Sequence, residues 1–413
     1  MKYLIANFLI QNHYQKLTRM NRTPNALAAT PIFLAFLCMG FGDVAGPLTG
    51  LVKEEFELSN AMAQLIPFMG FIMFGLLSLP MGIYQDRKSK KFILMLGLIL
   101  ALVGLVLPII GNFSTFSLLL LSILLLGAGA ATLQVAGNPI MRDVSPEGKY
   151  SRNLSLGQFV KAIGSLSGAL IPLLAVAYWN MDWKILFPIY SAFLLLTIVI
   201  LSAVRIPRPL AEQASAATFK STFRLMGNPY IFLMVMAIFV YVGAEVSMSA
   251  SLPIFLKSRY GIDLATLGIA GTGLFFVSLM TGRFLGGVIL NWITPRTFLT
   301  ITLLLSLVGL AGLFIQNQIA AIISIIVIGM SFANIFPLIF SITVDWMPHR
   351  SNELSGLMVT AIVGGAFIPP VMGLVADNIG IMLSFIVPML CILYILYVAL
   401  IGKKKGQQPA FEK

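Results

Sequence analysis

A five-residue motif occurs twice in this chain, 200 residues apart. Ser151-Arg152-Asn153-Leu154-Ser155 precedes Gly164, and Ser351-Asn352-Glu353-Leu354-Ser355 precedes Gly364. A further set keeps nearly the same offset: Gly82, Asp86 and Lys91 correspond to Gly287, Asn291 and Arg296. A repeat of this length indicates that the chain consists of two copies of one folded unit.

The composition places this unit in a membrane. Apolar residues make up 58% of the chain and charged residues only 10%, a balance that a water-soluble surface cannot carry. Twelve apolar runs, six in each copy, are long enough to cross a hydrocarbon core of roughly 30 Å. They lie at 27–49, 64–84, 92–111, 114–138, 152–178, 184–204, 229–252, 264–290, 297–315, 319–344, 354–376 and 381–401. We therefore predict an all-α integral membrane fold with two six-helix bundles.

The charges predict the orientation of these bundles. If both termini are cytoplasmic, 21 of the 27 Lys and Arg residues fall in cytoplasmic segments and 4 in outer loops, as the positive-inside rule requires. The net charge of +12 is then a topological signal and not a nucleic-acid-binding surface. The expected domains are a cytoplasmic arm (1–26), a bundle (27–204), a cytoplasmic linker (205–228), a second bundle (229–401) and a cytoplasmic tail (402–413).

Two six-helix halves with a central cytoplasmic linker resemble the major facilitator superfamily. Its halves are related by an axis along the membrane normal, and the substrate site lies between them. The stretch Gly82 to Lys91 looks like the helix 2–3 motif of that superfamily, so Asp86 and Arg87 are candidates for a cytoplasmic gate. The alternative is a basic loop that serves only to set the topology.

Three stretches narrow the resemblance to the fucose permease branch, the fucose–galactose–gluconate symporters. They are Gln134 to Pro139 with Arg152 and Gln158-Phe159, then Tyr241 to Ser247, and finally Ile335 to Phe340 with Ala361 to Ala366. The resemblance runs over nearly the whole chain. It implies a cavity lined chiefly by helices 1, 4, 5, 7, 10 and 11, and we expect close helix crossings where the halves meet, at Gly164-Ser165 and Gly364-Gly365.

Four charged residues lie well inside predicted spans: Asp43, Lys161, Glu245 and Arg283. A charge at this depth costs about 2.5–3.5 kcal/mol on insertion scales, so each is expected to face the bundle interior or a water-filled cavity. Asp43 and Glu245 occupy matching places in the first helix of each half and are candidates for proton coupling. The alternative is a structural role for both acids.

Lys161 needs an anionic partner. It lies about nine residues into its span, roughly 13 Å from the cytoplasmic face, whereas Asp43 lies roughly 24 Å from that face. Two partners therefore stay open: Asp43, if helix tilt and helix extensions absorb a mismatch of about 10 Å, or a carboxylate or phosphate of the substrate. Arg283 lies close to the inner end of its span, which favours a structural or gating role near headgroups or helix ends.

Uncharged polar residues complete the candidate substrate site. Their amide groups suit sugar hydroxyls, although each alone is more often a contact between helices. They are Gln134, Asn138, Gln158 and Asn334. The first three lie with Lys161 on adjacent helices 4 and 5, where we expect a binding wall.

The chain departs from the fucose permease pattern at the charged positions. Gln134 stands where the family has a glutamate, Gly46 where it has an aspartate, with Asp43 one turn earlier, and Lys161 where it has an asparagine. One acid is lost on helix 4 and one base is gained on helix 5. This change favours an anionic sugar derivative such as a hexuronate, gluconate or a sialic acid.

The sequence therefore predicts a secondary active transporter that imports a sugar or sugar acid, with H⁺ as the coupling ion and Na⁺ not excluded. The alternatives are an exporter of a small amphipathic compound and a non-transporting sugar sensor.

The chain has 2 histidines and no nucleotide-binding loop, so we expect neither an enzyme nor a cofactor or metal site. Cys38 and Cys391 lie in spans and predict packing, not a disulfide. We expect a monomer in the bacterial inner membrane, with the sugar and membrane lipid as its partners and no nucleic acid.

Overall fold

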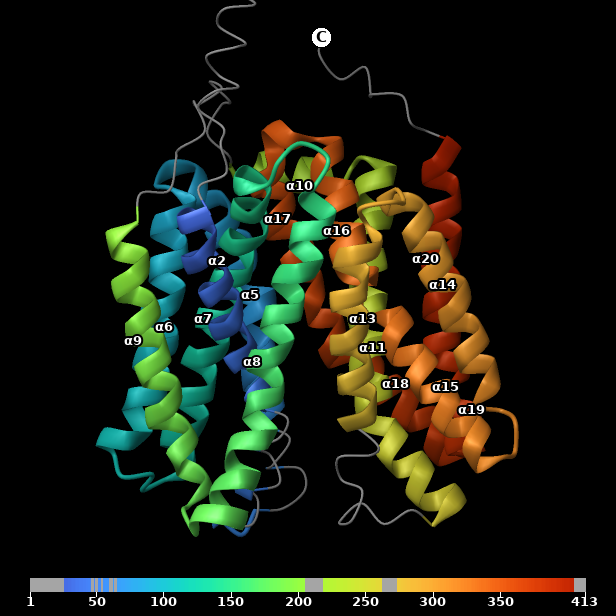
Figure 1. The fold of residues 1–413 in the computed structure, drawn as a ribbon, viewed down its shortest axis with the longest axis horizontal. Coiled ribbons are helices and arrows are strands. Elements are labelled where there is room, and N and C mark those ends of the chain that lie inside the picture. The colour runs from blue at the N-terminus through green and yellow to red at the C-terminus, as the bar shows by residue number, and fades with distance from the viewer. Residues whose placement is uncertain are drawn as a thin grey trace, which may run out of the picture.

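The structure is a computed structural model that describes residues 26–404 except for 46–47, 49–50, 53–54, 59–61, 63–64, 205–217 and 262–272. All regular elements of this part are helices, and Figure 1 shows them gathered into two bundles, one blue to green and one yellow to red. The predicted arm before residue 26, the linker before residue 218 and the tail after residue 404 lie outside the described residues.

The first bundle runs from α2 to α9. Its elements are α2 (Ala26–Gly40) with the 3₁₀ turn η1 (Phe41–Val44), α5 (Leu65–Arg87), α6 (Lys90–Ile110), α7 (Phe116–Val144), α8 (Tyr150–Trp179), η2 (Trp183–Ile185) and α9 (Leu186–Ala203). Between the bundles lies the short helix α10 (Phe219–Leu225).

The second bundle runs from α11 to α20, and three of its spans are broken into pieces. Its elements are α11 (Pro229–Tyr260), α13 (Leu274–Ile289), α14 (Pro295–Gly312), α15 (Gln318–Phe332) with α16 (Ile335–Trp346), η4 (Pro348–Arg350), α17 (Ser351–Thr360) with η5 (Ala361–Val363) and α18 (Gly364–Ile379), and α19 (Ile381–Ser384) with α20 (Ile386–Lys404). In the described part, ten helical segments are long and apolar enough to cross a membrane, and two apolar helices are shorter. The prediction of an all-helical membrane fold is confirmed.

Local sequence signals fix several helix starts. Ser89 begins α6 by accepting a hydrogen bond from the backbone N–H of Phe92 at 3.1 Å. Thr294 does the same for α14 at Thr297, and Pro295 stands in the first turn, where a missing N–H costs nothing. These caps place the short connections between apolar helices.

The two bundles converge at the end of the molecule that carries α10, which we call the linker end (Figure 1). Two glycines allow the closest approaches there. An added Cβ at Gly82 of α5 would lie 2.8 Å from the Cα atom of Gly356 on α17, and one at Gly287 of α13 would lie 2.6 Å from Leu156 on α8. Positions 156 and 356 both directly follow the repeated motif, so the two crossings are equivalent in the two copies.

Polar contacts between the bundles surround these crossings. The Ser151 and Ser341 hydroxyls are 2.7 Å apart, Arg142 Nε donates to Asp345 Oδ1 at 3.0 Å, and Ser355 Oγ donates to the Val135 carbonyl at 2.7 Å. All three join one half to the other. The linker end is therefore closed in this conformation.

Candidate functional site

Lys161 and Asp43 form an ion pair inside the first bundle. Lys161 Nζ lies 3.4 Å from Asp43 Oδ2, and the two side chains are 14% and 34% exposed. Asp43 also accepts a hydrogen bond of 2.6 Å from the Ser165 hydroxyl. The carboxylate is thus held by one cation and one hydroxyl, and both come from α8.

A close helix crossing brings this pair together. An added Cβ at Gly40 would lie 2.2 Å from the Lys161 carbonyl, and one at Gly164 would lie 2.2 Å from the Leu37 carbonyl. The prediction of a close crossing at Gly164 is correct, but its location was wrong, because the crossing joins α2 to α8 within one half. Gly364 likewise packs on Phe239 of α11 within the second half.

Of the two partners left open for Lys161, the structure shows Asp43, so the packing of the helices absorbs the expected height mismatch. Counting residues assumed that both spans start at one level on the cytoplasmic face. The crossing instead sets Gly40 level with Lys161, and η1 then carries Asp43 toward Ser165, one turn further along α8. The intramolecular partner of Lys161 is therefore Asp43 in this conformation.

A second buried ion pair lies in the other bundle. Arg283 of α13 has its Nη2 atom 3.2 Å from Glu245 Oε1 of α11, and the side chains are 11% and 18% exposed. Arg283 Nε also donates to the Ala333 carbonyl at 3.4 Å. The expectation that Arg283 reaches headgroups was wrong, because Glu245 holds the guanidinium inside the protein. The expected contact with a helix end is present, since Ala333 is the C-terminal cap of α15.

The two ion pairs belong to one electrostatic cluster. Arg283 Nη1 lies 3.5 Å from the carbonyl oxygen of Gln158, which belongs to α8 of the other half. Gln158 lies one turn before Lys161 on α8, so this contact joins the two ion pairs. The cluster has two acids and two bases, so its net charge is zero when all four residues are ionised.

The predicted binding wall on α7 and α8 is buried. Gln134 is 2% exposed, Asn138 0% and Gln158 2%. Gln134 Oε1, both amide atoms of Asn138 and Gln158 Nε2 have no hydrogen-bond partner among the described residues. Buried amides normally bind a partner. These three therefore provide unused donors and acceptors on α7 and α8.

Asn334 lies elsewhere. It stands at the break between α15 and α16, where its Nδ2 donates to the Gly282 carbonyl at 2.7 Å. An added Cβ at Gly286 would lie 2.3 Å from the same amide. Asn334 joins the helix break to α13, so it forms the contact between helices that was the alternative to sugar binding. Its Oδ1 has no partner among the described residues.

The gate residues are described only in part. Arg87 ends α5 and is exposed, whereas the side chain of Asp86 lies outside the described residues, as does Gly46. Gating by Asp86, Arg87 and Arg283 stays a prediction.

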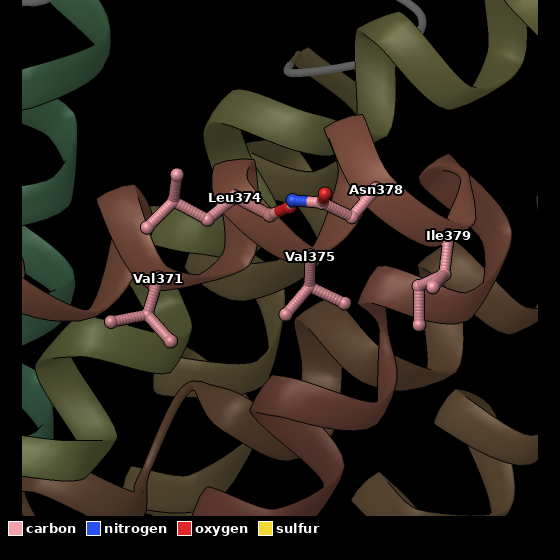
Figure 2. Close-up of a pocket in the computed structure, with 5 residues that line it drawn as sticks. All are labelled: Val371, Leu374, Val375, Asn378 and Ile379. Atoms are coloured by element: carbon pink, nitrogen blue, oxygen red, sulfur yellow. The ribbon is translucent and has the colours of Figure 1, made fainter.

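A shallow cavity of about 260 Å³ lies away from the charged cluster. Figure 2 shows its lining, Val371, Leu374, Val375, Asn378 and Ile379, all on α18. Four of these five side chains are apolar, and all five come from one helix. The described residues contain no group of three side chains able to hold a metal ion.

Sequence reasoning missed the role of Ser165. It treated Gly164-Ser165 only as small residues, yet the hydroxyl is the shortest polar contact of Asp43. The repeat carries a signal for this role, since the matching position in the second copy is Gly365, which has no hydroxyl.

Two helical bundles around buried charges define a membrane transport protein. The major facilitator superfamily model matches residues 32–361 and again 233–413, and the chain belongs to that superfamily. It is therefore a transporter and not an enzyme.

Several named proteins are similar to it. A glucose/galactose transporter of Brucella abortus is 30% identical over 391 residues, which cover 91% of this chain and 94% of the relative. An L-fucose-proton symporter of Escherichia coli is 24% identical and covers 89% of this chain and 90% of the relative. The solved structure of FucP in the outward conformation has a TM-score of 0.81 at 21% identity, over 92% of this chain and 99% of that one. The last likeness concerns the fold.

Proposed function

We propose that this chain imports a sugar or sugar acid together with a proton, by alternating access in the bacterial inner membrane. The similar proteins are a glucose/galactose transporter and a fucose–proton symporter, which supports a sugar as the substrate. The linker end would face the cytoplasm, in agreement with the distribution of Lys and Arg. The closed linker end would then correspond to an outward-facing conformation.

The observation that carries the proposal is the Lys161–Asp43 pair. The pair combines a buried cation with a partly exposed carboxylate, and α7 and α8 also carry the unused amides of Gln134, Asn138 and Gln158. The amides suit hydroxyl groups, and the ammonium suits a carboxylate. Such a set can bind a polyhydroxylated anion.

Coupling follows from an exchange of partners. An entering carboxylate takes the Lys161 ammonium, and Asp43 then loses its cation while it keeps the Ser165 hydroxyl. Binding a proton removes the charge that Lys161 no longer compensates. Substrate entry and proton entry are thereby linked through one lysine, and Glu245, with Arg283 as its partner, is the second candidate acid.

The test of coupling is transport in proteoliposomes. Asp43→Asn is expected to abolish accumulation driven by a pH gradient but to keep substrate exchange, because exchange moves no net proton. Asp182→Asn is the matched control, since Asp182 is 52% exposed and pairs with Lys184 outside the cluster. Unchanged accumulation in Asp43→Asn would remove Asp43 from coupling, and accumulation that followed a sodium gradient would replace the proton.

The test of specificity compares gluconate with galactose. Breaking a buried charge pair costs about 3–5 kcal/mol, so Lys161→Ala should lose most gluconate binding. Lys161→Asn introduces the residue that the fucose permease pattern has at this position. This variant should bind galactose in preference to gluconate. Lys184→Ala is the control lysine outside the cluster. A wild-type protein that carried only neutral sugars would refute the preference for an acid.

A further inference from the structure

Two basic side chains of the first half share one neutral oxygen of the second half at the linker end. Lys149 Nζ lies 3.3 Å from Asn291 Oδ1, and Arg152 Nη1 lies 3.1 Å from the same atom. The two cationic atoms are therefore no more than about 6.4 Å apart. Among the described residues, neither Lys149 nor Arg152 forms an ion pair.

The repeat explains why an acid is missing at this point. Asn291 corresponds to Asp86 of the first copy, so the second copy has an amide where the first has a carboxylate. The nearest acids along the chain do not compensate the two cations. Asp143 is held by Lys90 at 2.6 Å, and Glu147 is exposed and joins no ion pair among the described residues. Two like charges on one amide oxygen repel each other, and an anion would relieve that repulsion.

The surroundings indicate where such an anion would come from. Asn291 lies in the turn after α13, and the next residue, Trp292, is 75% exposed. Exposed tryptophans concentrate at the level of lipid headgroups. The start of α8 and the end of α13 both lie at the linker end (Figure 1). Basic pockets between helix ends at this depth bind the phosphates of anionic lipids.

We propose that Lys149 and Arg152 bind the phosphate of an anionic lipid headgroup, with Asn291 holding the two side chains in place. An ammonium has three donors and a guanidinium five, so both keep donors free beside their bonds to Asn291. Lys149 and Arg152 lie at the start of α8 in the first half, and Asn291 follows α13 in the second, so the lipid binds two side chains that Asn291 holds in place only while the halves are in contact. It therefore stabilises the conformation in which the linker end is closed. This site is independent of the transported substrate.

The test measures binding of short-chain phosphatidylglycerol to the full-length protein in a neutral detergent. Each basic group near an anionic headgroup is worth about fivefold in affinity, so Lys149→Ala with Arg152→Ala should weaken binding about 25-fold. Asn291→Asp should weaken it about fivefold or more, because the new carboxylate pairs with both cations. Lys220→Ala is the matched control, an exposed lysine of α10 at the same end, and should bind as the wild type does.

Three readouts decide the outcome. Phosphatidylglycerol bound equally well by the wild type, the double variant and Asn291→Asp would overturn the proposal. If inorganic phosphate displaced phosphatidylglycerol at equal concentration, the site would be one for free phosphate. This result would overturn the assignment to a lipid. Phosphatidylcholine, whose headgroup has no net charge, should bind several-fold more weakly, and equal binding would again overturn the proposal.

Discussion

Replacing Gly82 by alanine tests whether the crossing of α5 and α17 holds the linker end closed. The added Cβ would lie 2.8 Å from Gly356 Cα and 3.0 Å from the Asn352 carbonyl oxygen. Both obstacles are backbone atoms, so no rotamer change relieves them and the helices must separate. Overpacking of this kind costs about 1–3 kcal/mol, which corresponds to about a 5- to 150-fold change in an equilibrium.

This cost falls on one conformation. Gly82 belongs to the first half and Gly356 to the second, so the clash exists only while the linker end is closed. We therefore expect Gly82→Ala to shift the population toward molecules in which that end is open. Spin labels at Lys88→Cys and His349→Cys, both exposed and on opposite halves, should report longer distances by pulsed EPR.

Two glycines serve as controls. Gly75→Ala lies on the same helix, and its Cβ would meet Val363 of the other half at an ordinary 3.4 Å, so the distances should not change. Gly127→Ala would place a Cβ 2.4 Å from the Gly70 carbonyl inside one half, so it should lower the melting temperature without changing the distances. Wild-type distances in a well-folded Gly82→Ala protein would refute the reasoning.

Further predictions concern stability and are checked by thermal unfolding in detergent. Gly40→Ala places a Cβ 2.2 Å from a backbone carbonyl of α8 and should cost about 3 kcal/mol or more, together with loss of transport. Arg283→Ala leaves Glu245 buried without its cation and should cost about 3–5 kcal/mol. Arg142→Ala should cost no more than about 1 kcal/mol, because its pair with Asp345 is 29% and 47% exposed. Equal losses of stability in Arg283→Ala and Arg142→Ala would contradict the expectation that the more buried ion pair contributes more.

The helices were predictable because a membrane constrains the length of each apolar segment, and this length can be counted along the chain. A span needs a minimum length of apolar residues, and that length is visible in the sequence. The breaks within spans were not predicted. The interruption between α15 and α16 at Asn334 depends on the bond from this side chain to the Gly282 carbonyl, a contact between distant segments.

The charged residues of the site were predictable for the same reason, but their partners were not. Asp43, Lys161, Glu245 and Arg283 are conspicuous in apolar spans. The height of Asp43 beside Lys161 depends on how α2 crosses α8 at Gly40, and sequence counting contains no such information. The direction of Arg283 likewise depends on the position of α11.

The two glycine crossings at the linker end have the geometry of an isologous interface. Gly82 of the first copy contacts the segment around Gly356 of the second, and Gly287 of the second contacts Leu156 of the first. Reciprocal contacts of this kind arise when identical subunits associate about a two-fold axis. An unduplicated six-helix ancestor could have closed the same end as a homodimer, with one glycine position serving both crossings. After duplication the two copies of each position became free to diverge. The residue opposite the glycine already differs, because Leu156 faces Gly287 and Gly356 faces Gly82.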